Sequence, residues 1–154
     1  MKIPLLFLDL DGVVNGHEWN EEAESTTFIK SCVTQLNRII HTAKPDVVLS
    51  SAWRYMILNG AMNLLGFHHL LRSHGVTRKI NLIGTTKPDE AIPTRGGQIQ
   101  DWLKLHGKNY HPFVVVDDLD LDISPRGLPF VQTVKKVGLT VKDADRIISM
   151  LLKG

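Results

Sequence analysis

The chain of 154 residues lacks the features that define several classes of protein. It has a single cysteine, Cys32, which excludes an intrachain disulfide and is typical of a reducing compartment. No apolar stretch is long enough to span a bilayer. The net charge of +2 is too small to indicate nucleic-acid binding by itself. What remains is an ordinary globular composition, with enough residues for one domain spanning 1–154 and too few for two.

The sequence also lacks the motifs of two well-known kinds of phosphate chemistry. There is no glycine-rich phosphate loop of the Walker type. Cys32 and Arg38 have the spacing of cysteine-dependent phosphatases, but no glycine lies between them and Cys32 falls on the apolar face of a predicted helix. That chemistry needs a thiolate in a phosphate-binding loop, so the pattern favours a buried structural cysteine.

Short apolar runs alternate with segments of helical periodicity. Strands are predicted at 4–8, 46–49, 80–83, 113–116 and 130–133. Residues 55–72 have a helical pattern, with interruptions predicted at Gly60 and Gly66. The alternation of strands and helices implies an α/β fold with a parallel, doubly wound sheet.

The most informative segment is the first strand and the residues that follow it. The apolar run ends directly in Asp9 and Asp11, and Gly12 comes next. Open α/β sheets bind their ligands at the carboxyl ends of the strands. Two carboxylates so close together are costly unless a cation or a proton accompanies them. We therefore expect chemistry at this position.

Two other predicted strands also end in polar side chains. The second strand leads into Ser50 and Ser51, and the fourth leads into Asp117 and Asp118. Because carboxyl ends of parallel strands meet at one edge of the sheet, Asp9, Asp117 and Asp118 are expected to converge.

The segment Asp9-Leu10-Asp11-Gly12-Val13 resembles the first motif of the haloacid dehalogenase-like (HAD) superfamily, whose members are mostly Mg²⁺-dependent phosphatases. Residues 50–54, 95–103, 115–118 and 138–140 resemble a small capless branch, found as phosphatase modules beside kinase or ligase modules in RNA-repair proteins. This resemblance implies a Rossmann-like three-layer sandwich with a central five-stranded parallel sheet. The 154 residues include no kinase or ligase module and indicate no particular protein partner.

The resemblance implies a role for each residue of the first motif. Asp9 is the expected nucleophile, which forms an aspartyl-phosphate, and Asp11 is the expected general acid and base. Asp9, Asp117, Asp118 and the backbone carbonyl of Asp11 are the expected ligands of Mg²⁺, which prefers oxygen donors. Gly12 is expected to allow a tight backbone path after the motif.

Two choices stay open among the phosphoryl ligands that the resemblance implies. Ser50 is the preferred hydroxyl, and Ser51 is the alternative. Arg95 is the preferred cation because it adjoins a predicted helix, and Lys87 on the preceding loop is the alternative.

Trp53 and Arg54 follow the second strand and lie near the expected site. Trp53 could stack on a base or pack under the adjacent helix, and Arg54 could hold a substrate phosphate or pair with a carboxylate. Trp19, in a polar stretch over 15–24 that could form a short flap, could close over substrate or anchor its loop.

Taken together, the sequence predicts a Mg²⁺-dependent phosphohydrolase that acts on a nucleotide or on a terminal phosphate of RNA or DNA. A phosphatase of small metabolites and a non-catalytic phosphate-binding regulatory module are the alternatives. We expect a cytoplasmic protein without membrane association, because removal of the amino terminus as a signal peptide would delete the aspartates.

Overall fold

The computed structural model describes residues 2–15 and 27–153. Its strands are β1 (Ile3–Leu8), β2 (Asp46–Leu49), β3 (Asn81–Thr85), β4 (Tyr110–Asp117) and β5 (Phe130–Gln132). Its α-helices are α1 (Lys30–Ala43), α2 (Tyr55–Leu58), α3 (Leu64–Ser73), α4 (Arg95–His106) and α5 (Val141–Leu152). Three single turns of 3₁₀ helix complete it: η1 (Ala52–Arg54), η2 (Gly107–Asn109) and η3 (Ser124–Arg126). Trp19 and the part of the predicted flap beyond Asn15 lie outside the described residues.

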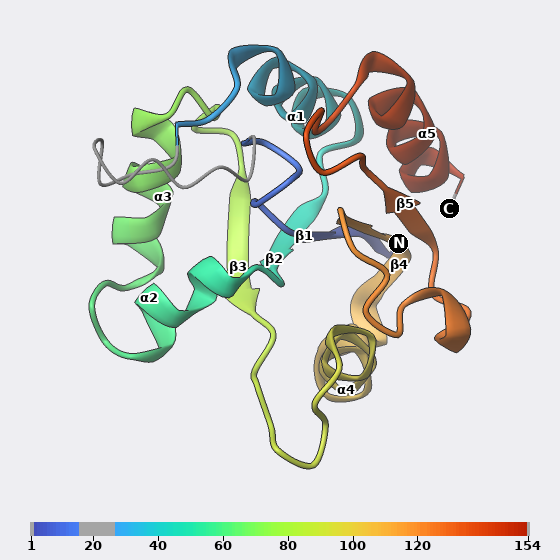
Figure 1. The fold of residues 1–154 in the computed structure, drawn as a ribbon. Coiled ribbons are helices and arrows are strands. Elements are labelled where there is room, and N and C mark those ends of the chain that lie inside the picture. The colour runs from blue at the N-terminus through green and yellow to red at the C-terminus, as the bar shows by residue number, and fades with distance from the viewer. Residues whose placement is uncertain (1, 16–26, 154) are drawn as a thin grey trace.

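The five strands form one parallel sheet in the order β3-β2-β1-β4-β5, with β1 at its centre. Helices α1 and α5 lie together on one face of the sheet, and α4 lies on the opposite face (Figure 1). The chain leaves β1 toward β2 and β3 and then crosses to the other side of β1 to form β4. The carboxyl ends of β1 and β4 therefore meet at the point where the strand order reverses, which is where such sheets bind ligands. The predicted Rossmann-like three-layer architecture is confirmed.

Strand β1 shows why the apolar runs become central strands. Its residues Leu5 to Leu8 are completely buried, and they alternate between the two sides of the sheet. Leu6 and Leu8 pack with α1, α3 and α5, while Leu5 and Phe7 pack with Ile99 of α4. A strand covered on both faces needs apolar residues at every position rather than at every second one.

The helical segment after β2 differs in part from the prediction. The interruption at Gly60 is confirmed, since this glycine has a φ of +81° between α2 and α3. The interruption predicted at Gly66 is wrong, because Gly66 lies in the first turn of α3 and donates its backbone N–H to the side chain of Asn63. A glycine is tolerated there because the N-cap contact stabilises the turn. Strand β3 also begins one residue later and ends two residues later than predicted.

No helix in the described ranges is both long and apolar enough to cross a membrane.

Candidate active site

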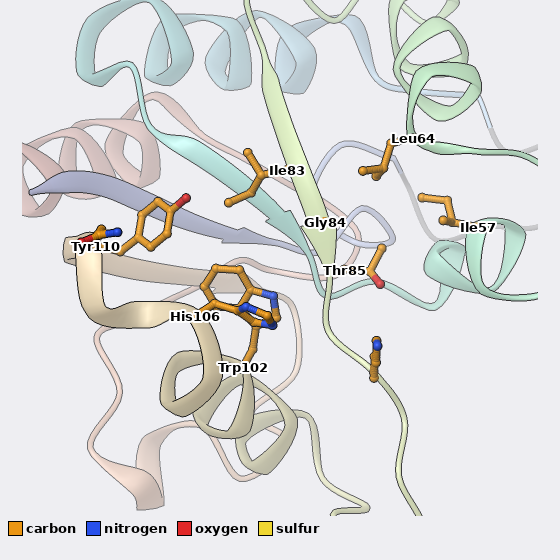
Figure 2. Close-up of a pocket in the computed structure, with 10 residues that line it drawn as sticks. Ile57, Leu64, Ile83, Gly84, Thr85, Trp102, His106 and Tyr110 are labelled. Atoms are coloured by element: carbon orange, nitrogen blue, oxygen red, sulfur yellow. The ribbon is translucent and has the colours of Figure 1, made fainter.

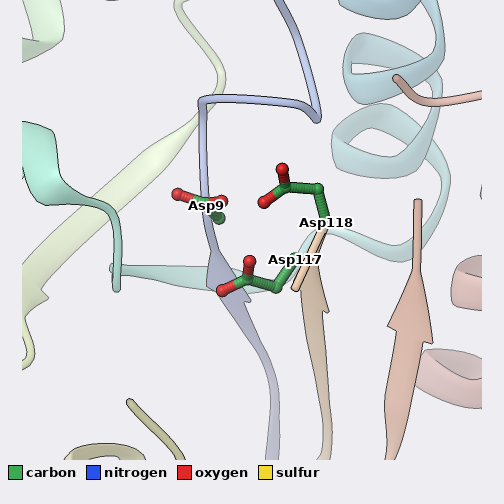
Figure 3. Close-up of side chains that lie close together, drawn as sticks. All are labelled: Asp9, Asp117 and Asp118. Carbon is green, nitrogen blue, oxygen red and sulfur yellow. The ribbon is translucent and has the colours of Figure 1, made fainter. Parts of the chain in front are cut away.

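Three aspartates gather at the carboxyl ends of the two central strands. Asp9 follows β1, Asp117 ends β4, and Asp118 follows it, and their side chains point toward one another (Figure 3). Carboxylate oxygens of all three lie within 4.8 Å of one another, and the residues are at most 5% exposed. The convergence predicted from the sequence is found. A buried set of oxygen donors at this spacing is suited to a divalent cation.

Arg95 at the start of α4 partly neutralises this cluster. Its Nη1 lies 2.6 Å from Asp117 Oδ2 and 3.6 Å from Asp9 Oδ2. Burial lowers the pKa of the Arg95 guanidinium, but Asp117 and Asp9 outweigh this effect and raise the pKa overall. Burial and the charge of Asp117 raise the pKa of Asp9 to about 9, although Arg95 opposes them. One guanidinium thus leaves negative charge in the cluster uncompensated.

The position of Arg95 is set by the loop that follows β4. Gly96 donates its backbone N–H to the carbonyl of Leu121, and the Thr94 hydroxyl, which caps α4, donates to Asp122. A Cβ at Gly96 would overlap the backbone carbonyl of Asp122, so only glycine allows this approach. The loop that follows Asp117 and Asp118 therefore also positions the start of α4, and with it the side chain of Arg95.

Ser50 and Ser51 have different environments at the end of β2. Ser51 Oγ accepts the backbone N–H of Trp53 and caps the turn η1. Ser50 is completely buried beside the end of β1, where its N–H donates to the carbonyl of Leu8. Its hydroxyl has no hydrogen-bond partner among the described residues. A buried hydroxyl without a partner is costly, which indicates that a ligand completes its bonding.

Arg54 is 5% exposed and has only neutral partners in the described part of the chain. Its Nη1 donates to the Ser50 carbonyl and to Thr86 Oγ1, and its Nη2 donates to Gln98 Oε1. Within the described ranges no carboxylate pairs with Arg54, which contradicts that expectation for this part of the chain. Its Nε has no hydrogen-bond partner among the residues that the structure describes. A buried cation held by neutral groups places positive charge beside the aspartates and favours an anion there.

Lys87 does not belong to the carboxylate cluster. It is exposed on the loop after β3 and lines an open pocket of about 590 Å³. The pocket lies between α2, β3 and the end of α4, where Trp102, His106 and Tyr110 form its aromatic side (Figure 2). Of the described residues predicted for the site, Lys87 alone lines this pocket. The structure thus brings Arg95, and not Lys87, to Asp9 and Asp117.

Gly12 has the conformation expected for a tight path after the first motif. Its φ is +75°, a region that side chains disfavour. A Cβ at this position would overlap the carboxylate of Asp118. Its carbonyl accepts the hydroxyl of Thr133, which lies after β5. The glycine therefore lets the backbone of the first motif approach the metal-binding aspartates predicted at the end of β4.

Asp11 lies apart from the cluster, and its side chain is partly exposed. Its Oδ1 accepts hydrogen bonds from Trp53 Nε1 at 2.9 Å and from Asn15 Nδ2 at 2.8 Å. The indole also packs edge-on against Phe28 and Phe67, with ring centroids 5.6 and 6.5 Å away. Trp53 thus packs against Phe28, which precedes α1, and against Phe67 of α3, and in addition contacts Asp11, which neither of the two predicted roles included.

Sequence reasoning missed four residues that hold the site together: Asn15, Thr86, Gln98 and Thr133. All four are buried polar residues. Each is separated from its partner by a turn or by a long stretch of chain. The signals in the sequence were weak: Asn15, Thr86 and Thr133 lie near the first motif or the ends of predicted strands, and Gln98 lies in the segment 95–103 that carries the resemblance. Their contacts depend on tertiary packing, which periodicity does not reveal.

Comparison with known proteins agrees with this geometry. The fold and the carboxylate cluster agree with membership of the HAD superfamily, and the chain belongs to the family described as the HAD domain in Swiss Army Knife RNA repair proteins, which it matches over residues 5–144. A search of curated proteins gives no significant match.

Two solved structures are similar to this fold. A putative HAD superfamily (subfamily III A) hydrolase from Legionella pneumophila is 14% identical, with a TM-score of 0.52, over 99% of this chain and 85% of the other. A putative 3-deoxy-D-manno-octulosonate 8-phosphate phosphatase from Vibrio cholerae is also 14% identical, with a TM-score of 0.44, over 98% and 83%. At 14% identity, the structure from Legionella pneumophila supports the fold alone. Proteins of the HAD family generally depend on a metal ion.

Proposed function

We propose that this protein is a Mg²⁺-dependent phosphohydrolase that removes a terminal phosphate through an aspartyl-phosphate on Asp9. The observation that carries the proposal is the buried cluster of Asp9, Asp117 and Asp118, with Arg95 beside it. On the neighbouring strand end, Ser50 offers an unused hydroxyl. One side of the site thus suits a cation, and the other suits the oxygens of a phosphoryl group.

The donor set fits Mg²⁺. Three carboxylates within 4.8 Å of one another offer hard oxygen ligands, and we assign the backbone carbonyl of Asp11 as a further one. The raised pKa of Asp9 means that the cluster keeps a proton at neutral pH unless a cation replaces it. A bound Mg²⁺ supplies charge neutralisation at the phosphoryl oxygens.

The proposed reaction has two steps. Asp9 attacks phosphorus, the bond from phosphorus to the leaving oxygen breaks, and Asp11 gives that oxygen a proton. Water then attacks the aspartyl-phosphate, Asp11 takes a proton from this water, and the bond between phosphorus and Asp9 breaks. Inorganic phosphate leaves, and both aspartates return to their starting states.

The remaining side chains bind the phosphoryl group and its substrate in this proposal. Ser50 and Arg95 donate to the phosphoryl oxygens, because Ser51 is occupied as a helix cap and Lys87 lines a different pocket. Arg54 adds positive charge behind Ser50, whose carbonyl it holds. Gly12 keeps the motif close to Asp118.

We infer that the substrate is a nucleotide or a phosphate-bearing end of RNA or DNA. The support is the family itself, which is described from RNA repair proteins. The single cysteine suits a cytoplasmic setting for such an enzyme.

The test is phosphate release with Mg²⁺ and with chelator, from matched oligonucleotides that carry a 3′- or a 5′-phosphate and from mononucleotides. Asp9→Asn serves as the control protein. Metal-dependent release from one oligonucleotide end supports end processing. Release only from small phosphates points to a metabolite phosphatase, and no release even from a generic aryl phosphate contradicts the proposal.

A further inference from the structure

The carboxyl group of Asp11 is held from two sides at a single oxygen. Trp53 Nε1 and Asn15 Nδ2 both donate to Oδ1, at 2.9 and 2.8 Å. Within the described residues, Oδ2 accepts no hydrogen bond. We propose that Trp53 and Asn15 are positioning residues that fix the Asp11 carboxyl, so that Oδ2 is the oxygen that exchanges the proton with the leaving group. The inference rests on the proposed function.

The orientation of Asn15 follows from its other contact. The backbone N–H of Gly12 can only donate, and it donates to Asn15 Oδ1 at 3.0 Å. The amide nitrogen of Asn15 must therefore face Asp11. The side chain is completely buried, and its backbone pairs with Asp11 and Phe28. Asn15 thus links the backbone of the turn at Gly12 to the side-chain carboxyl group of Asp11.

Trp53 is held just as firmly on the other side. Its ring packs against Phe28 and Phe67, and its backbone N–H donates to Ser51 Oγ at the end of β2. An indole N–H donates and cannot accept, so this contact requires Asp11 Oδ1 to act as an acceptor. The turn after β2 therefore places Ser50 for the phosphoryl group and Trp53 for the acid that serves it.

The two donors have a consequence for proton transfer. An oxygen that already accepts two hydrogen bonds is the less favourable place for a proton, so a proton on this carboxyl resides on Oδ2. In the first step that proton moves from Oδ2 to the leaving oxygen as its bond to phosphorus breaks. Fixing the carboxyl plane reduces the orientational freedom that the acid would otherwise lose on the way to the transition state.

The experiment compares leaving groups that differ in their need for a proton. The rate of leaving-group release in the first turnover is measured for p-nitrophenyl phosphate and for aryl and alkyl phosphates with more basic leaving oxygens. Trp53→Phe keeps a ring against Phe28 and Phe67 and removes the N–H. We expect the rate for the most basic leaving groups to fall on the order of 10- to 100-fold, a part of the usual benefit of a general acid. The p-nitrophenyl rate should change less than about 3-fold, because that leaving group needs no proton.

The chain offers a matched control in Trp102→Phe. Trp102 is also partly buried and packs edge-on against Phe7, with ring centroids 5.6 Å apart, on the α4 side of the sheet. The same chemical change there should leave the dependence on leaving group unchanged. A double variant sharpens the result: once Asp11→Asn has removed the acid, Trp53→Phe should have no further effect on the most basic leaving group.

The outcomes separate this inference from the proposed function. If the unmodified protein hydrolyses none of the phosphates, the proposed function fails. If it hydrolyses them and Trp53→Phe slows all of them equally, Trp53 is only a packing residue and the inference is overturned. If Trp53→Phe does not fold, benzothienylalanine at position 53 keeps the bicyclic shape with sulfur in place of N–H, and the same two results decide.

Discussion

The two sides of the candidate site favour ligands of opposite charge. At the ends of β1 and β4, three buried aspartates share one arginine, and the pKa of Asp9 rises to about 9. At the end of β2, the buried Arg54 has neutral partners, and the hydroxyl of Ser50 has none among the described residues. One side therefore favours a cation and the other favours an anion.

This difference supports the proposal that the site binds a divalent cation on one side and a phosphoryl group on the other. A divalent cation and a phosphoryl group neutralise each other as well as the protein on either side. The burial of both halves strengthens these interactions, because fewer water molecules screen them. The following predictions test the two sides separately, from the largest expected effect to the smallest.

Asp9→Asn tests the acidic side. Without the nucleophile, phosphate release should fall by more than about 10³-fold. The protein should stay folded, and at pH 8 its thermal unfolding should occur at a higher temperature, because a buried carboxyl that resists ionisation is gone. Phosphate release and thermal unfolding measure the two effects. A fully active variant would show that Asp9 does not carry the reaction.

Arg95→Gln and Lys87→Gln form a matched pair for the cation. Arg95 contacts Asp117 and Asp9, so its replacement should lower turnover by about 10²- to 10³-fold. Lys87→Gln should change turnover less than about 3-fold, as for an exposed surface cation. Steady-state kinetics on the same substrate give both values. The reverse order of effects would assign the role to Lys87.

Ser50→Ala and Ser51→Ala separate the two hydroxyls. Loss of the Ser50 hydroxyl should lower turnover by about 10²-fold and leave stability unchanged or higher, since that group has no partner to lose. Loss of Ser51 removes a helix cap and should cost about 1 kcal/mol of stability, with the smaller effect on turnover. Urea unfolding and kinetics on both variants distinguish the roles. Equal kinetic losses would argue against this division.

The metal-free protein should become less stable as the pH rises. In the unfolded chain Asp9 loses its proton near its ordinary pKa of 3.8, but in the folded chain it keeps the proton to about pH 9. Between these values the folded state binds more protons, so the free energy of unfolding falls with increasing pH, by at most about 1.4 kcal/mol per pH unit. Thermal unfolding in chelator from pH 5 to 9 measures this, with Asp9→Asn as a flatter control. Identical slopes for the two proteins would contradict the effect assigned to Asp9.

Much of the fold follows from the sequence, because the central strands are covered on both faces. Continuous apolar runs such as Leu5–Leu8 leave few alternatives to a buried parallel strand. Strand boundaries were predicted less well than the strands themselves. The edge strand β3 begins one residue later and ends two residues later than predicted, and the central strand β4 begins three residues earlier and ends one residue later. The predicted break at Gly66 failed because a local cap outweighs the low helix propensity of glycine.

Some features of the candidate site could be predicted from the sequence, and others could not. The convergence of Asp9, Asp117 and Asp118 could be predicted, since each aspartate follows a recognisable strand. The partners of Arg54 and the contact between Trp53 and Asp11 could not, because they join turns far apart in the chain. Spacing along the sequence locates the ends of strands, but it does not show which turns meet above them.

The position of β1 at the centre of the sheet also has a consequence for folding. Leu6 pairs with Val47 on one side and with Val114 on the other, so one partner follows roughly a hundred residues later in the chain. During synthesis on the ribosome, β1 and β2 can pair early, while the other edge of β1 stays open until β4 emerges. An apolar strand with an open edge is prone to pair with other chains. We therefore expect the rate of translation and the presence of chaperones to change the yield of soluble protein more than they change the stability of the folded protein.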